Sequence, residues 1–470
     1  MPLSDQPDVT AAEHEDALRF LHERTDYERS LAIPYSRWGL KLQRMRDLLA
    51  RVGDPQRGLP IIHVAGTKGK GSTAAMAAAV LTAAGYRTGL FTSPHLDSVH
   101  ERIALDGRPC TPAELVQLVD RVRPAVAEID EAAARDHPAD GGPTFFEITT
   151  AMALLHFAAC RAHAAVLEVG LGGRLDSTNV CRPLVAAITS ISFDHTQQLG
   201  NTLEAIAREK AGIIKPGVPV ISGVIEPGPR EVIRRTCRRR RSPLVELGVD
   251  FDFRYDPPRN LDCADGLGQL DFHSGAGQSQ RRYVDVPLRL LGQHQAANAA
   301  VALAAIGRLQ DAGWTIPEEA VRAGLGGVVW PVRVESISRR PAVIIDAAHN
   351  VASVEALVRV LDECFSPRRR LLLFATTRQK DIRGMLRSLL PHFQHAILTQ
   401  YLNNPRAAPV EELEAVAREL TGQSYPAYQD PIRAWRAVRA LAAPEDLICV
   451  TGSFYIAAQI RAQVMMNDEC

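Results

Sequence analysis

The sequence predicts two α/β domains, the first built on a doubly wound parallel sheet. Apolar runs rich in β-branched residues alternate with helical stretches, a pattern typical of parallel strands joined by helical crossovers. Early in the chain, one such run leads through a cluster of glycines directly into a helix. Past the middle of the chain the alternation stops and then resumes, which indicates a second domain of the same class.

The first domain is expected over residues 1–327, and its strands follow from the apolar runs. These runs cover residues 60–65, 88–92, 164–169, 185–191 and 218–222. A helix is expected to begin at Thr111, because Thr111-Pro112-Ala113-Glu114 combines a capping box with proline at the first helical position. From about Glu226 to Val286, Pro, Gly, Asp and Gln dominate, and we expect a small β-hairpin excursion there.

The second domain is expected over residues 328–470, after linker material at Gly326-Gly327 and Pro331. Its expected strands cover residues 342–345, 371–375, 395–399 and 447–451. Its expected helices cover residues 351–364, 381–390, 410–421 and 431–441. This alternation predicts a Rossmann-like domain that shares its class, but no visible repeat, with the first.

The glycine cluster predicts a phosphate-binding loop and therefore an ATP site. It consists of Gly66, Thr67, Lys68, Gly69, Lys70, Gly71 and Ser72. Glycines let backbone N–H groups turn toward a phosphate, and a helix N-terminus adds partial positive charge. Lys70 can reach the outer phosphates, and the Ser72 hydroxyl can bind Mg²⁺.

The cluster departs from the standard P-loop pattern, which places Ser or Thr directly after the lysine. Here Gly71 follows Lys70, and Val64 stands where the first glycine belongs. The alternative is a turn of small residues that only packs a helix on a sheet. The order of strand, glycines, lysine and hydroxyl favours the phosphate site.

Two further strands of the first domain lead into polar residues that suit a metal. Glu168 lies near the carboxyl end of its strand, and Asp194-His195 follows the next one. Ligands of open α/β sheets bind outside these strand ends, where a carboxylate can hold magnesium. The alternatives are an ion pair between Glu168 and Arg174, and a core role for His195. Spacing alone makes Lys210 an ordinary helix lysine, paired with Glu204 or Glu209.

Composition favours a soluble enzyme whose partners are small molecules. Fifty-four basic residues balance fifty-four acidic ones, so charge gives no reason to expect nucleic acid or membrane as a partner. The run Arg238–Arg241 is interpreted as a solvated helix end or loop. The eight cysteines form no C-x-x-C pair, which argues against a zinc site or a disulfide framework. The polar N-terminus does not resemble a signal peptide, and no apolar run could span a membrane, so a cytoplasmic location is expected.

A set of longer strings makes a specific resemblance visible. In chain order they are HVAGTKGKGS, TSPHLDSVHERI, FEITTAMALLHF, LEVGLGGRLDSTN, DHTQQLG, EKAGIIKPG and DAAHN. Together they resemble the Mur ligase superfamily, and within it the folylpolyglutamate synthase and dihydrofolate synthase family. The similarity runs from Tyr27 to about Tyr455, which is most of the chain.

The resemblance implies roles for individual residues of the first domain. It implies that Lys70 and the neighbouring amides hold the ATP phosphates and that Ser93 and Glu168 are magnesium ligands. His195 resembles the histidine that completes magnesium binding. Lys210 matches the lysine that the family carbamylates with carbon dioxide, which would create a carboxylate-like ligand for a second magnesium ion.

The resemblance also implies a nucleotide contribution from the second half of the chain. Gln295 and Asn298 match positions near the nucleotide, and Arg333 resembles an arginine that reaches the ATP phosphates. Asp346 and His349 resemble that domain's contribution to nucleotide and phosphates, with Asn350 beside them.

Three positions depart from the pattern of the family. Lys68 stands where asparagine is commoner and adds charge beside the phosphates. Val332 and Ala347 replace common glycines, and they are expected to affect backbone angles around Arg333 and His349, because glycine tolerates positive φ.

The implied activity is ATP-dependent amide formation between L-glutamate and the carboxylate of a folate or dihydropteroate. The folate substrate is expected near residues 93–102, and a monomer is expected. One alternative is a cell-wall Mur-type amino-acid ligase, which the short stretch of about sixty residues before the glycine loop disfavours. The other is a non-catalytic nucleotide-binding protein, which the intact metal positions disfavour.

Overall fold

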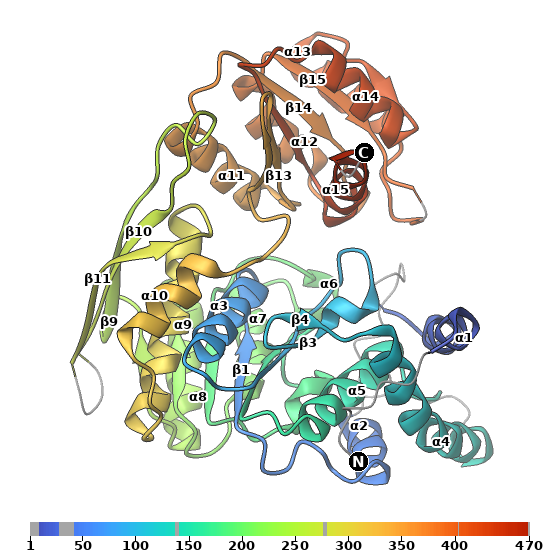
Figure 1. Cartoon of the computed structure of the whole chain (residues 1–470), viewed down its shortest axis with the longest axis vertical. Coiled ribbons are helices and arrows are strands. Elements are labelled where there is room, and N and C mark those ends of the chain that lie inside the picture. The colour runs from blue at the N-terminus through green and yellow to red at the C-terminus, as the bar shows by residue number, and fades with distance from the viewer. Residues whose placement is uncertain (1–8, 28–41, 137–140, 276–279, 403, 469–470) are drawn as a thin grey trace. The chain divides into compact units, whose positions relative to one another are not determined.

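The computed structural model describes residues 9–27, 42–136, 141–275, 280–402 and 404–468 (Figure 1). It forms two compact units, called here unit 1 and unit 2. Unit 1 comprises Met1–Arg254, Leu270–Val286 and Ala297–Val328. Unit 2 comprises Tyr255–Gln269, Pro287–Ala296 and Val329–Cys470, so two short segments from the middle of the chain group with the C-terminal part.

Unit 1 is built on an eight-stranded sheet in the order β4-β3-β2-β5-β1-β6-β7-β8. Its strands are β1 (Ile61–Ala65), β2 (Thr88–Phe91), β3 (Ile103–Leu105), β4 (Arg108–Pro109), β5 (Ala164–Glu168), β6 (Val185–Ile188), β7 (Val220–Ser222) and β8 (Leu244–Glu246). The pairs from β2 to β8 are parallel, and β3 and β4 add an antiparallel edge. The five strands expected from the sequence are confirmed, although β6 ends three residues early because polar residues follow Ile188.

Among the described residues, helices pack on this sheet in two separate apolar cores. One core joins Phe91, Leu167 and neighbouring strand residues to helices α1 (Ala11–His22), α2 (Leu42–Arg51), α4 (Pro112–Asp136) and α5 (Phe145–Ala159). The other joins Ala65 and Ile188 to helices α7 (Leu203–Lys210) and α8 (Pro227–Arg240). The predicted α/β fold is therefore confirmed for unit 1.

The capping box expected at Thr111 is present and starts a long helix. The Thr111 hydroxyl accepts a hydrogen bond from the Glu114 N–H at 3.2 Å, and the Glu114 carboxylate accepts one from the Thr111 N–H at 2.7 Å. Helix α4 then runs to Asp136 with Pro124 inside it.

None of the described helices has both the length and the apolar character that crossing a membrane requires.

The expected β excursion begins later than the sequence indicates. Helix α8 and strand β8 occupy residues 227–246 and continue the α/β alternation. Three further strands then form a separate small sheet, in the order β11-β10-β9: β9 (Phe251–Asp256), β10 (Gly268–Ser274) and β11 (Arg281–Leu288). The sequence pattern does not reveal α8, because this helix is rich in arginine and buries only Pro229, Ile233 and Cys237.

Unit 1 ends with most of helix α9 (Gln293–Asp311), whose first turn groups with unit 2, and with helix α10 (Glu318–Gly327). Helix α10 packs against helix α3 (Lys70–Ala83), and the two lie side by side in Figure 1. Their approach depends on Gly324, because a Cβ atom there would lie 2.6 Å from the backbone of Val80. Helix α3 is therefore held along its length while its N-terminus faces the carboxyl edge of the sheet.

Unit 2 contains a six-stranded sheet in the order β12-β13-β17-β14-β15-β16. Its strands are β12 (Glu335–Arg339), β13 (Ala342–Ile345), β14 (Arg370–Phe374), β15 (His395–Thr399), β16 (Ala427–Tyr428) and β17 (Leu447–Thr451). Only the β12–β13 pair is antiparallel. The helices are α11 (Val351–Cys364), α12 (Ile382–Leu389), α13 (Val410–Thr421), α14 (Pro431–Leu441) and α15 (Phe454–Asp468). The strands and helices expected in this half are confirmed, mostly to the residue.

Candidate functional site

Strand β1 ends at Ala65, and the glycine loop follows it directly. Gly66 and Gly69 have φ values of +155° and +79°, where a side chain is strained. Neighbouring atoms also leave no room for a side chain at either position. A Cβ atom at Gly66 would lie 1.9 Å from the Thr189 hydroxyl, and one at Gly69 would lie 2.0 Å from the Asn298 amide oxygen. The loop then enters α3, with Gly69 as its N-cap.

Hydroxyl groups after β6 hold the glycine loop in place. The Thr189 hydroxyl donates to the Lys68 carbonyl at 2.5 Å, and the Ser190 hydroxyl accepts the Lys68 N–H at 3.1 Å. The Thr67 N–H donates to the Ser190 carbonyl at 2.7 Å. Sequence reasoning missed this role for Thr189 and Ser190. The available signal was a pair of hydroxyl residues directly after a strand that neighbours the glycine-loop strand.

Glu168 lies beside the start of α3. Parallel pairing of β1 with β5 sets Val64 opposite Glu168, so the carboxylate emerges at the same sheet edge as the glycine loop. It is buried, its Oε1 lies 3.9 Å from Lys70 Nζ, and its Oε2 accepts the Ser93 N–H at 3.2 Å. The alternative ion pair with Arg174 is wrong, because Arg174 pairs with Glu209 at 3.0 Å.

Lys210 is not an ordinary helix lysine. Its side chain is buried, and Nζ donates to the Gly66 carbonyl at 2.8 Å. Burial lowers its pKa to about 7, and the positive charges of Lys70 and Lys68 contribute in the same direction, against Asp194 and Asp176. The alternative partner Glu209 is engaged with Arg174. Burial therefore favours the neutral form of the Lys210 amine, which is the nucleophilic form.

Asp194 lies beside the glycine loop, whereas its neighbour His195 is exposed to solvent. The Asp194 carboxylate is 3.9 Å from Lys68 Nζ, which joins it to the glycine loop. His195 is exposed, has φ +48° and begins the short helix α6 (Thr196–Leu199). The core role considered for His195 is therefore wrong. Among the described residues, no three His, Cys, Asp or Glu side chains form a ready-made metal cluster.

The remaining residues predicted near the loop are Ser72, Gly71 and Asn298. Ser72 is buried in the first turn of α3, after Gly71. The Asn298 side chain packs over Gly69, and the backbone carbonyl of Asn298 accepts a hydrogen bond from the Thr73 hydroxyl at 3.4 Å. Unit 1 thus brings together a phosphate-type loop, a cation, a carboxylate and a neutral amine at one sheet edge.

In unit 2, Asp346 organises the carboxyl end of β13. Its Oδ2 accepts the Val334 N–H at 2.9 Å, and its Oδ1 accepts the Ala348 N–H at 2.8 Å. Burial raises the pKa of Asp346, while nearby Arg333 and these two N–H groups oppose the rise. Asp346 therefore holds the turns that carry Arg333 and His349.

Arg333 and His349 occupy these two turns of unit 2. The Arg333 guanidinium donates to the Val332 carbonyl at 3.0 Å and lies 5.9 Å from the ring centroid of Phe454. His349 Nδ1 donates to the Ala347 carbonyl at 3.0 Å. The predicted effect at Val332 is present, because this β-branched residue has φ +52°. Gln295, also in unit 2, is buried in the first turn of α9.

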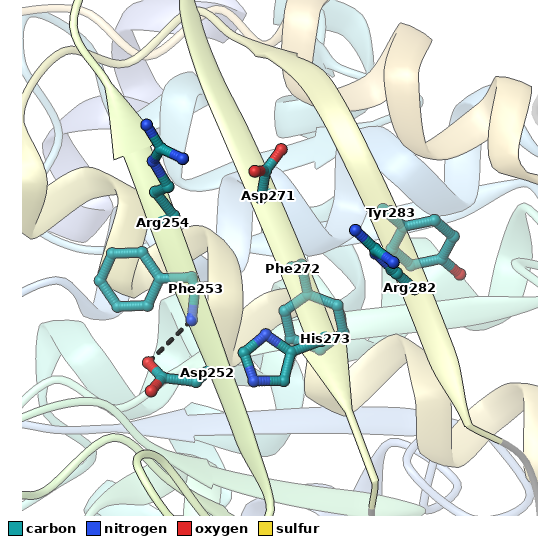
Figure 2. A pocket seen from close by; sticks show the side chains of 8 residues that line it. All are labelled: Asp252, Phe253, Arg254, Asp271, Phe272, His273, Arg282 and Tyr283. Carbon is teal, nitrogen blue, oxygen red and sulfur yellow. Dashed lines mark hydrogen bonds between the residues drawn. The ribbon is translucent and has the colours of Figure 1, made fainter.

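A hollow of about 440 Å³ lies over strands β9, β10 and β11 of the small sheet. Figure 2 shows the side chains around it, among them Arg254, Asp271, His273 and Arg282. The Asp252 carboxylate there accepts the N–H of its neighbour Phe253. None of the residues predicted for the site lines this hollow, so the glycine-loop edge is the candidate site.

Comparisons with known proteins identify the family of this chain. Residues 64–306 match the Mur ligase middle domain, and residues 332–454 match the Mur ligase glutamate ligase domain. The chain is 35% identical to the dihydrofolate synthase/folylpolyglutamate synthase of Bacillus subtilis, over 96% of this chain and 99% of that protein.

Solved structures give the same result. The Mycobacterium tuberculosis folylpolyglutamate synthase complexed with ADP superposes with a TM-score of 0.85 at 34% identity, covering 96% of this chain and 98% of that one. Escherichia coli FolC in complex with DHPP and ADP gives 0.79 at 30% identity, covering 96% and 98%. The chain belongs to the Mur ligase family, in its folylpolyglutamate and dihydrofolate synthase group, and is an ATP-dependent ligase.

Proposed function

We propose that this chain joins L-glutamate to the carboxylate of a folate or dihydropteroate through an acyl phosphate, using the glycine-loop edge of unit 1. The observation that carries the proposal is the convergence of Lys70, Glu168 and Lys210 around Gly66 and Gly69. A structural turn needs no such set of polar groups, because a carboxylate such as Glu168 and an amine such as Lys210 cost free energy to bury.

The first step transfers the γ-phosphoryl group of ATP. A carboxylate oxygen of the folate substrate bonds to the γ-phosphorus, the bond from that phosphorus to the β,γ-bridging oxygen breaks, and ADP leaves. In such reactions the protein contributes mainly positioning and charge neutralisation. Backbone amides of Gly69–Ser72 and the Lys70 ammonium group supply both at the start of α3.

The second step forms the amide. The neutral amino group of glutamate attacks the acyl carbon, the resulting tetrahedral intermediate expels inorganic phosphate, and the nitrogen loses a proton. Exclusion of water protects the acyl phosphate from hydrolysis until glutamate attacks. Ser93 and the loop that follows it would lie near the folate carboxylate.

Magnesium fits the donor set of unit 1. We assign Ser72, Ser93, Glu168 and His195 as its protein ligands, with two ions held together with ATP. Glu168 supports the assignment, since it is a buried carboxylate at the loop and already lies beside the Ser93 backbone. When bound, the metal would neutralise charge on the transferring phosphoryl group. The assignment of His195 rests on the family resemblance.

Lys210 is proposed to carry a carbamate. Its neutral Nζ attacks the carbon of CO₂, an N–C bond forms, one C–O π pair moves to oxygen, and the nitrogen releases a proton. Two features support this: the depressed pKa of about 7 and the local charge balance. Lys68 and Lys70 face the carboxylates of Asp194 and Glu168 at this edge, and a carbamate would convert the neighbouring amine of Lys210 into an anion. The resulting excess of negative charge suits a divalent cation.

Unit 2 is proposed to supply Arg333 and His349 to the phosphates and Gln295 to the nucleotide. Asp346 supports these roles indirectly, by fixing the backbone on both sides of the arginine and histidine. Asn298 of unit 1 would contact the nucleotide beside Gly69. We further propose that the enzyme acts as a monomer in the cytoplasm.

The test is phosphate release from ATP in the presence of glutamate and either tetrahydrofolate or dihydropteroate. The proposal predicts release only when both glutamate and a pterin substrate are present, with a product heavier by one glutamyl residue. A product from dihydropteroate assigns dihydrofolate synthesis, and a product from tetrahydrofolate assigns polyglutamylation. Release that is indifferent to both substrates, or that instead requires a UDP-muramoyl peptide, would contradict the proposal.

A further inference from the structure

Helices α14 and α15 of unit 2 pack against each other and line a hollow of about 310 Å³ (both helices are labelled in Figure 1). The lining residues are Ile432, Trp435, Arg436 and Arg439 of α14 and Gln463 of α15. The four α14 positions are spaced by three or four residues, so they share one face of that helix. None of the residues assigned above to ATP, metal or folate lines this hollow.

The charged side chains of the hollow are both arginines. Arg436 and Arg439 are exposed, and within the described part of the chain neither has a carboxylate in ion-pair range. The Arg439 guanidinium lies 5.8 Å from the ring centroid of the buried Trp435, a cation–π contact that orients it on this face of the helix. The hollow therefore has two cations above an apolar floor.

Exposed arginines on other helices of this chain are neutralised locally. Arg235 pairs with Glu231 and Arg418 pairs with Glu414, each with a carboxylate four residues earlier. Helix α14 contains no acidic residue, and its N-cap Asp430 accepts two N–H groups of the first turn. The α14 face thus keeps its positive charge, which is complementary to an anionic ligand.

The hollow begins at the edge of unit 2 that carries Arg333. Helix α15 starts with Phe454, whose ring centroid lies 5.9 Å from the Arg333 guanidinium. Helix α14 follows β16, a strand that runs parallel to β15, so its first turn with Ile432 also lies at the carboxyl edge of the sheet. From this edge the two helices run along the hollow as far as Arg439 and Gln463.

The product of the proposed reaction is an anion that grows with each turnover. Every glutamate brings two carboxylates and uses one of them when the next glutamate is joined to it, so each internal residue keeps one free carboxylate. We propose that the hollow binds the glutamyl tail of a folate that already carries several glutamates. Arg436 and Arg439 contact its free carboxylates, and Ile432 and Trp435 contact its methylene groups. The inference rests on the proposed function, because repeated ligation is what builds such a tail.

The length of the helices sets the shortest tail that can fill the hollow. Gln463 follows Phe454 by nine residues on α15, which is about 14 Å at the helical rise of roughly 1.5 Å per residue. A glutamyl residue linked through its side-chain carboxylate spans about 6 Å, because it has five bonds along the chain where an ordinary residue has three. A single glutamate does not reach along this distance, whereas a tail of three or more does.

The test compares tetrahydrofolates that carry one and four γ-linked glutamates as substrates. In Arg436→Gln/Arg439→Gln the KM for the tetraglutamate should rise about fivefold, because two exposed charged contacts are lost. The KM and kcat for the monoglutamate should stay within about twofold of the natural values. Raising the salt concentration to about 0.5 M should shrink the difference, because salt screens exposed charges. An unchanged tetraglutamate KM, or an equal rise for both substrates, would overturn the inference.

Arg433→Gln is the matched control. Arg433 lies on the same helix, is exposed and has no carboxylate in ion-pair range among the described residues, but it does not line the hollow. Its replacement should leave the KM for both substrates unchanged. A rise in the tetraglutamate KM as large as that of the double variant would assign the effect to general surface charge and overturn the inference.

Binding without turnover separates this inference from the proposed function. Saturation-transfer NMR of a γ-linked tetraglutamate peptide with the full-length protein should show binding to the natural enzyme and to Arg433→Gln, and a weaker signal with the double variant. An enzyme that glutamylates no folate yet binds this peptide would contradict the proposed function and leave the hollow as an anion site. An enzyme that glutamylates the monoglutamate but does not bind the peptide would overturn the tail site alone.

Discussion

The carboxyl edges of the two parallel sheets are built in different ways. In unit 1, charged side chains contact one another and the glycine loop: Lys70 meets Glu168, Lys68 meets Asp194, and Lys210 bonds to Gly66. In unit 2, the carboxylate of Asp346 accepts backbone N–H groups, and Arg333 and His349 bond to the carbonyls of nearby residues. Unit 1 has a charge cluster assembled in advance, whereas unit 2 presents two side chains from a fixed backbone.

This difference indicates a division of labour. A cluster assembled in advance can neutralise charge on a transferring phosphoryl group without reorganising, which is the main contribution of proteins to such steps. Side chains presented from turns can bind a nucleotide and be withdrawn when it leaves. Substitutions in unit 1 should therefore mainly affect kcat or phosphate binding, and those in unit 2 should have smaller effects.

The largest effect is expected for Lys70→Ala. Removing the ammonium group beside Glu168 should lower kcat/KM by at least about a hundredfold, as loss of a charged donor at a phosphoryl-transfer site does elsewhere. Steady-state phosphate release at saturating ATP measures it. Arg239→Ala, at an exposed cation at the end of α8, is the control and should behave as the natural enzyme. Near-normal activity of Lys70→Ala would remove Lys70 from the site.

The second largest effect is expected for Gly69→Ala, which tests the close fit between the loop and Asn298. Its Cβ would meet Asn298, so the KM for ATP should rise about tenfold or more, whereas Gly85→Ala has a similar φ of +87° and open space. Both variants should lose about 1 kcal/mol of stability through the positive φ. Adding Asn298→Gly to Gly69→Ala removes the clash and should recover part of the loss. Equal ATP KM values for the two single variants would contradict the close fit of the loop.

Asp346→Ala probes the edge of unit 2. Two buried N–H groups, of Val334 and Ala348, lose their acceptor, which should cost about 1–3 kcal/mol of stability and raise the KM for ATP about three- to tenfold. Asp381→Ala is the control, because Asp381 only caps helix α12 through the Gly384 N–H. It should lose about 1 kcal/mol of stability with unchanged kinetics. A hundredfold loss in Asp346→Ala would show that this edge also takes part in the chemistry.

The pH dependence of the free energy of unfolding tests whether the pKa of Lys210 is depressed in the apo protein. Its folded pKa of about 7 lies below the unfolded value of 10.5, so the unfolded chain binds more protons between these values. The contribution of Lys210 to stability therefore rises with pH through this window, and the penalty of burying its charge is fully present below about pH 7. Lys210→Met should stabilise the protein by a few kcal/mol at pH 6, and by much less at pH 10. Denaturant unfolding in CO₂-free buffer measures the difference, and equal stabilisation at both pH values would contradict the depressed pKa.

The smallest effect is expected at Val332. Its φ of +52° is costly for a β-branched residue, and glycine removes that strain while adding backbone entropy to the unfolded chain. Val332→Gly should therefore stabilise unit 2 by at most about 1 kcal/mol, with ATP KM unchanged within about twofold. A melting temperature lower than that of the natural enzyme would show that the valine side chain contributes more by packing than its backbone costs.

Much of this architecture could be predicted from local sequence patterns. Strands such as Ala342–Ile345 and Leu447–Thr451 are buried apolar runs with polar borders, and their limits follow directly. Glu168 could be placed at the sheet edge because it ends such a run. The resemblance to the Mur ligase superfamily is confirmed by the comparisons.

Contacts between residues far apart in the chain could not be predicted in this way. Lys210 follows a helical pattern that looks solvated, and only its bond to Gly66, 144 residues away, shows that it is buried at the loop. The bond between His63 and Thr178 spans 115 residues and has no local signal. The local sequence favours an ion pair between Glu168 and Arg174, but the end of α7 brings Glu209 to Arg174 instead.

The central claim is that the carboxylate of the folate substrate is phosphorylated before glutamate attacks. Folate labelled with ¹⁸O in the reacting carboxylate tests it directly, with unlabelled ATP and glutamate. An acyl phosphate passes its bridging oxygen to phosphate when the acyl C–O bond breaks, so one ¹⁸O should appear in inorganic phosphate for each amide formed. Inorganic phosphate without ¹⁸O, released in step with amide formation, would contradict the account.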